Sequence, residues 1–263
     1  MTCGILVFHF SLFSFHFRQD CFSFFTFRFS LKFYYVCHMD INLIFRFLRD
    51  IAAHNDREWF HAHRAYYEEA RASFEELTAM VIARIGAWDE SVRLLTPRDC
   101  TYRIYRDTRF TTDKSPYKTH FGMFINARGK NSDHCGYYLH LQPEQSLFAG
   151  GNYCPPPALL RAIRQAVYDN MDEFRSIVED PEFTQYFPTM GADLLKTAPK
   201  GFAKDYPFLK YLQPRTYEVC HYVDDDFFLA PDFLDKAEPI FRQMRRFNDF
   251  LNYTIDEFMD ESE

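Results

Sequence analysis

The chain has 263 residues, of which 47% are hydrophobic, and its 30 Lys and Arg residues face 37 Asp and Glu residues, for a formal net charge of -7. That length is sufficient for one sizeable core. The negative balance excludes nonspecific duplex binding over the whole surface, although a local basic patch can still bind an anion. The seven cysteines form no CxxC pair, which favours reduced thiols and a cytoplasmic location over a disulfide framework.

Residues 1–38 differ from the rest of the chain. They hold 11 of the 31 Phe residues and only four charged ones. They lack the basic n-region of a signal peptide and an uninterrupted apolar run of about 20 residues, so they indicate neither secretion nor membrane insertion. We expect the natural protein to start at Met39, residues 1–38 to be a Phe-rich extension outside the fold, and residues 39–263 to form a single α+β domain.

Helices are predicted at the start of this domain. Apolar residues at helical spacing over 43–51 indicate a first helix, which Asp40 or Asn42 can cap. A longer helix is predicted from an N-cap at Asn55 down to Gly86, because its apolar stripe continues at steps of three and four.

Strands are predicted in the middle of the chain and near its end. The segments with strand composition are 101–110, 120–128, 135–142, 145–149 and 215–223. Their short, turn-rich connections favour a meander, so we expect an antiparallel sheet of about five strands, flanked by N-terminal and C-terminal helices. Alternation places Tyr138 and His140 on a polar face of this sheet, opposite an apolar face.

The C-terminal half is again helical. A helix with an apolar stripe follows Gly150 and Gly151, a short helix is predicted over 181–187, and a closing helix over about 231–258. The paired glycines have two explanations: close approach of the backbone to a ligand at a helix N-terminus, or tight packing of the strand against a helix.

The most unusual segment is 102–118, which carries five basic residues and two acidic ones. We expect a strand up to about residue 110, a bulge or strand end near Arg106 and Asp107, and a turn fixed by Pro116. Arg and Lys side chains steadied by Asp are suited to holding a phosphate or carboxylate. The alternative is an internal ion-pair network that fixes the loop to the sheet.

This segment also carries a family resemblance. The string Arg106-Asp107-Thr108-Arg109-Phe110, followed by Asp113-Lys114-Ser115-Pro116-Tyr117-Lys118, resembles the central signature of the family known as domain of unknown function 2461. Further marks of the family are Asn55-Asp56-Arg57-Glu58-Trp59-Phe60, Gly150-Gly151, Leu160-Arg161-Ala162-Ile163-Arg164 and Pro199-Lys200-Gly201-Phe202. The resemblance covers roughly residues 41–258 and implies a shared fold, but no established activity.

The candidate ligand-binding residues come from the basic segment and from nearby loops and strands. They are Arg103, Arg106, Asp107, Arg109, Lys114, Tyr117, Lys118, Tyr138, Gly151 and Lys200. No GxSxG, Walker or HExxH motif is present, so the sequence indicates no catalytic residue and no cofactor. We predict no metal site, because His134, Cys135, His140 and Cys154 do not have the spacing of a zinc site.

The residues favour a binding protein or enzyme for an anionic small molecule held by an Arg and Lys clamp. Two alternatives stay open: a protein that binds nucleic acid or processes phosphodiesters with a metal on Asp107 and Asp113, and a non-enzymatic interaction module with a structural ion-pair network. We expect no membrane partner, and the sequence indicates neither an oligomeric state nor whether the protein is an enzyme.

Overall fold

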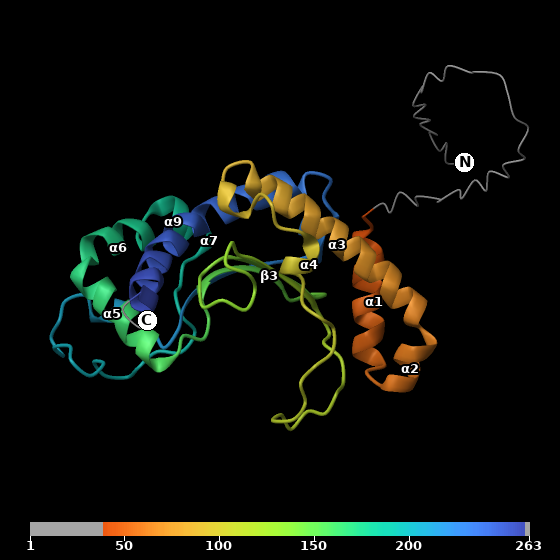
Figure 1. The fold of residues 1–263 in the computed structure, drawn as a ribbon, viewed down its shortest axis with the longest axis horizontal. Helices are drawn as coiled ribbons and strands as arrows, with labels where there is room; N and C mark the ends of the chain where they lie inside the picture. The colour runs from red at the N-terminus through yellow and green to blue at the C-terminus, as the bar shows by residue number, and fades with distance from the viewer. Residues whose placement is uncertain (1–38, 261–263) are drawn as a thin grey trace, which may run out of the picture. The chain divides into compact units, whose positions relative to one another are not determined.

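The computed structural model describes residues 39–260 and shows an α+β fold; the prediction for residues 1–38 lies outside this range (Figure 1). The strands are β1 (Phe121–Ile125), β2 (Tyr137–Leu141), β3 (Ser146–Asn152) and β4 (Tyr217–Val223). The α-helices are α1 (Ile41–Ala53), α2 (Arg57–Ala62), α3 (Arg64–Gly86), α4 (Pro97–Cys100), α5 (Pro157–Asp169), α6 (Met171–Val178), α7 (Pro181–Tyr186), α8 (Asp225–Leu229) and α9 (Phe233–Asp260). Two short 3₁₀ helices are η1 (Glu90–Val92) and η2 (Leu209–Tyr211).

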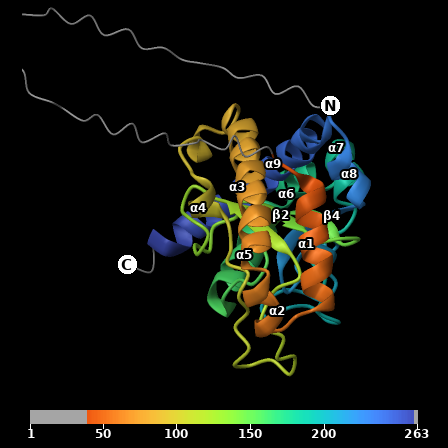
Figure 2. The ribbon, with the colours of Figure 1, turned by 90° about the vertical axis from the view of Figure 1, so that its right-hand side faces the viewer.

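The sheet is an antiparallel meander with strand order β1-β2-β3-β4, which confirms the predicted architecture. It has four strands instead of about five, because only the start of the predicted strand 101–110 contacts it, through a bridge from Thr101 to Met123 and a hydrogen bond of 3.1 Å from Tyr102 N to Gly122 O. That segment folds back on its own continuation: Arg106 N donates to Pro116 O at 2.9 Å, and Lys118 N donates to Ile104 O at 2.8 Å. The result is a long loop, yellow-green in Figure 1 and Figure 2, that extends away from the sheet.

Helices cover one face of the sheet. The apolar side chains of β2, Tyr137, Leu139 and Leu141, are 4%, 1% and 0% exposed on that face, as the alternation predicts. Aromatic contacts join helix and sheet, including Phe74 of α3 against Phe121, with ring centroids 5.0 Å apart, and Phe241 of α9 against Phe148, at 5.2 Å. Helices α1 and α3 lie side by side on the same side of the core (Figure 2).

The first helix is capped as predicted, but the start of the second one differs from the prediction. Asp40 caps α1 by accepting from Leu43 N at 3.0 Å, as expected. Asn55, however, is no N-cap, because its side chain binds the backbone of Tyr117 through two hydrogen bonds of 3.0 Å. Asp56 caps α2 instead. The predicted long helix is interrupted at His63, which separates α2 from α3.

The predicted helix after the glycine pair is also divided. Asn170, with φ -115° and ψ 39°, separates α5 from α6, although the buried residues of both helices continue one apolar stripe. The short helix α7 and the closing helix α9 lie where the sequence predicts them.

Candidate functional site

The sheet face opposite the helices forms the floor of a pocket of about 730 Å³. Its side chains alternate with those of the core, and the strand register aligns them in two rows. Phe124, Tyr138, Ala149 and Cys220 form one row, and His140, Leu147 and Tyr222 form the other. Gly122 makes room at one side, because a Cβ there would lie 2.9 Å from the hydroxyl oxygen of Tyr138.

Two imidazole rings lie together in this pocket. His120, just before β1, and His140, in β2, have ring centroids 4.0 Å apart. Burial lowers the pKa of His120 to about 3, and the charges of His140, Lys118 and Arg106 act in the same direction. Burial likewise lowers the pKa of His140. Both rings are therefore neutral at pH 7.

Both ring nitrogens of His140 are engaged in hydrogen bonds. Its Nε2 lies 3.0 Å from Oε1 of Gln142, and its Nδ1 lies 3.0 Å from the hydroxyl oxygen of Tyr138. Because an amide oxygen only accepts, Nε2 carries the proton and Nδ1 accepts from the tyrosine. Burial raises the pKa of Tyr138 to about 12, which keeps this hydroxyl a neutral donor.

Lys118 is not among the residues that line the pocket, but its positive charge acts on this pair of rings. Its side chain is half-buried, with Nζ 5.3 Å from the centre of the Tyr102 ring, which lines the pocket. Burial lowers the pKa of Lys118, and the charge of the exposed Arg103 adds to this effect. Within residues 39–260, Lys118 has no carboxylate at ion-pair distance. Among the described residues, no carboxylate therefore compensates its charge.

The other predicted cations are compensated inside the loop. Arg106 pairs with Asp113, and Arg109 Nη2 lies 2.7 Å from Oδ2 of Asp107. Lys114 Nζ donates to a backbone carbonyl of the same loop at 2.8 Å. These contacts form an ion-pair network within the loop, and none of them fixes the loop to the sheet as the alternative interpretation of the sequence expected. Asp107 therefore steadies Arg109, at a distance from the sheet, and not Arg106.

The remaining predicted residues have different surroundings. Tyr117 is a core residue, 2% exposed, whose ring stacks on Phe60 with centroids 4.1 Å apart. Tyr138 and Gly151 line the pocket. Lys200 is exposed in a turn and does not belong to the pocket lining in the described part of the chain.

Packing explains the paired glycines without a ligand. Gly151 has φ 89°, and a Cβ there would lie 2.1 Å from Tyr217 O and 2.7 Å from Cε1 of Phe247. A Cβ on Gly150 would meet Met244 of α9 at 3.1 Å. Contacts with β4 and α9 therefore require small residues here.

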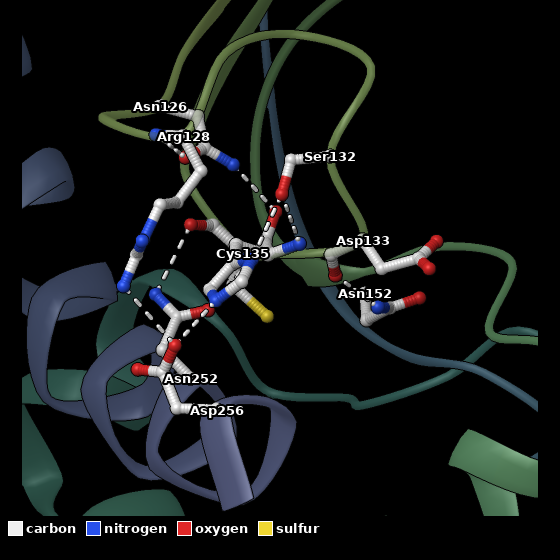
Figure 3. A network of polar contacts seen from close by, with 9 residues as sticks. Asn126, Arg128, Ser132, Asp133, Cys135, Asn152, Asn252 and Asp256 are labelled. Carbon is white, nitrogen blue, oxygen red and sulfur yellow. Dashed lines mark hydrogen bonds and ion pairs between the residues drawn. The ribbon is translucent and has the colours of Figure 1, made fainter. Parts of the chain in front are cut away.

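A polar wall of the pocket is formed by the loop between β1 and β2, and Figure 3 shows its contacts. Asn252 of α9 binds the backbone of Cys135 twice, accepting from its amide at 2.7 Å and donating to its carbonyl at 3.2 Å. Asp256, one turn further along α9, accepts from His134 Nε2 at 2.9 Å. Ser132 Oγ lies 2.8 Å from His134 Nδ1.

Sequence reasoning missed much of this site. It considered His134 only as a zinc ligand and did not consider Ser132 or Asp256, which are brought together by tertiary contact between a loop and α9. It placed His140 on the polar face but gave no role to His120. The signal for this ring pair was available, because a histidine directly before a strand can face a histidine on the neighbouring strand.

Fold and site together define an α+β protein with a histidine- and tyrosine-lined pocket on the open face of a meander sheet. The chain belongs to the family of conserved hypothetical proteins DUF2461, whose sequence model matches residues 43–250. This match confirms the resemblance inferred from the motifs. Neither a curated protein nor a solved structure matches the chain. No helix between residues 39 and 260 is both long and apolar enough to cross a membrane.

Proposed function

We propose that the pocket binds a small molecule bearing a phosphate or carboxylate group and that Lys118 attracts this group. The observation that carries the proposal is the half-buried, uncompensated ammonium of Lys118 beside the neutral pair His120 and His140. Arg106 and Arg109 are less suited, because each already has a carboxylate partner. A partly desolvated charge without a partner interacts more strongly with an incoming anion than an exposed one does.

The histidine pair would respond to such a ligand. An anion near the rings favours their charged forms, so binding would raise the pKa of His120 and His140 and be accompanied by proton uptake. Asp133 and Glu218 also line the pocket, and their carboxylates disfavour a ligand that is negatively charged throughout. We therefore favour a ligand with its anionic group at one end.

The proposal is tested by thermal unfolding in the presence of phosphate, sugar phosphates, dicarboxylates and short oligonucleotides. A ligand at about 100 times its Kd stabilises the folded protein by roughly 2.7 kcal/mol. Lys118→Met should abolish the shift in Tm, whereas the matched control Arg109→Met should retain it.

The screen also separates the alternatives. A shift with oligonucleotides alone would favour nucleic-acid binding, and a shift lost in Arg109→Met but kept in Lys118→Met would place the anion on the loop. If no anion shifts the Tm, the proposal is wrong and an interaction module becomes the better explanation. The free thiols of Cys100, Cys135, Cys154 and Cys220 support a cytoplasmic location as part of this proposal.

A further inference from the structure

We propose that Ser132 is a nucleophile, activated by His134 and Asp256, that accepts the acyl group of an ester or thioester. This inference concerns the polar wall of the pocket and goes beyond the proposed anion binding, on which it does not depend. It rests on three side chains in line: a hydroxyl, an imidazole and a carboxylate.

The geometry fixes which nitrogen of His134 acts as the base. Asp256 Oδ1 lies 2.9 Å from Nε2, and a carboxylate can only accept, so Nε2 carries the proton of the neutral ring. The other nitrogen, Nδ1, is then unprotonated and lies 2.8 Å from Ser132 Oγ. This is the arrangement by which an acid, a base and a hydroxyl activate a nucleophile, with the two ring nitrogens exchanged relative to the serine proteases.

The surroundings hold the ring in this orientation. The His134 side chain is 7% exposed, and Asn126 Nδ2 donates to the His134 carbonyl at 2.7 Å. Ser132 Oγ also accepts from the His134 amide at 3.1 Å, the bond of a serine turn. A hydroxyl can accept that bond and still donate its proton to Nδ1. A turn motif alone would explain the amide bond, but it does not require a carboxylate on the far side of the ring.

Ser132 lies at a pocket that a substrate can enter. Ser132 is half-buried and lines the pocket together with His134. Lys130 lines the same pocket, and its Nζ is held by the carbonyl oxygens of Arg98 and Thr101 at 2.7 and 2.9 Å. This fixed ammonium is the group we assign to stabilising the oxyanion that forms on the substrate.

In the proposed reaction, Ser132 Oγ forms a bond to the acyl carbon while its proton passes to His134 Nδ1. The bond from the acyl carbon to the alkoxy oxygen or thiolate sulfur then breaks, and the leaving group takes the proton from Nδ1. Water repeats the two steps, with His134 accepting a proton from water and returning it to Ser132. The products are a carboxylic acid and an alcohol or thiol.

A fluorophosphonate tests the nucleophile, because an activated serine displaces its fluoride and keeps the phosphonyl group. The full-length protein is treated with the probe, and the modified peptide is identified by mass spectrometry. We expect modification at Ser132 and none at Ser115, a serine bound to Asp113 without an imidazole partner. Asp256→Asn should slow the modification by about 100-fold, because an amide can donate to Nε2 and place the ring proton on Nδ1.

Ser132→Ala should remove the modification, and its Tm reports whether the fold is intact. Folded wild-type protein that gains no phosphonyl group at Ser132 overturns the proposal. So does modification of Ser132 at equal rates in the wild type and in folded Asp256→Asn. If Asp256→Asn does not fold, His134→Gln provides the same comparison, since it removes the base and should slow the modification by about 100-fold.

Discussion

Gly151 and Gly129 have nearly the same φ, 89° and 88°, but different surroundings. A Cβ on Gly151 would lie 2.1 Å from a backbone oxygen of β4, whereas a Cβ on Gly129 would meet nothing within 4 Å. Gly129→Ala should therefore cost only about 1 kcal/mol of unfolding free energy, for the left-handed backbone. Gly151→Ala should cost several times as much. Urea denaturation measures both, and equal losses would contradict the packing role of Gly151.

The half-buried ring of His120 makes stability depend on pH. Its pKa is lowered to about 3 by burial, so between about pH 6.5 and pH 3 the unfolded chain binds a proton that the folded protein does not. This ring's contribution to stability is thus present above pH 6.5 and lost as the pH falls toward 3.

His120→Gln should weaken the fall in unfolding free energy between pH 7 and pH 4. His61→Gln, at an exposed histidine of α2, is the control that should leave the pH dependence unchanged. Urea denaturation at a series of pH values measures both variants. Parallel curves for wild type and His120→Gln would show that His120 protonates freely in the folded protein.

At the scale of elements, the sequence predicts the strands of the sheet well and the basic segment poorly. Alternation identifies β2 and its buried face because a partner strand lies on each side. Residues 102–110 have the same composition, but composition does not show whether a partner is available. Their bridge from Tyr105 runs to Tyr117 within the same loop, so no fifth strand forms.

Neither the helix interruptions nor the contacts of the polar wall can be predicted from the sequence, for related reasons. The apolar stripe continues through His63 and Asn170, since both halves of each helix pair pack on one core, and the stripe therefore conceals the break. Ser132 and His134 are separated from Asp256 by most of the C-terminal half of the chain. Only the fold brings α9 to this loop, and no local pattern in a single sequence records that contact.

At the scale of the whole molecule, one core joins both ends of the described chain. Helix α9 contacts β3, α3 and α5. Helix α1 packs against α3 and so belongs to the same core. The two Trp residues report on different parts of it: Trp59 lies in α2, and Trp88 packs against Tyr137 with ring centroids 5.6 Å apart. We therefore expect a single unfolding transition.

Variants Trp59→Phe and Trp88→Phe leave one tryptophan each, so their tryptophan fluorescence tests this expectation directly. Urea midpoints from the two fluorescence signals should coincide with each other and with the midpoint from far-UV circular dichroism. Separated midpoints would show that the α1–α3 region unfolds independently of the sheet and α9.

Helix α9 also bears on how the protein is made. It packs on β3 and against α3, α5, α6, α7 and α8, and it supplies the Asn252 and Asp256 side chains that hold the polar wall. A ribosome synthesises this helix after every element that it contacts. The face of β3 on which α9 packs therefore stays without this helix until α9 has been translated, and nascent chains would depend on chaperones to shield that face until then.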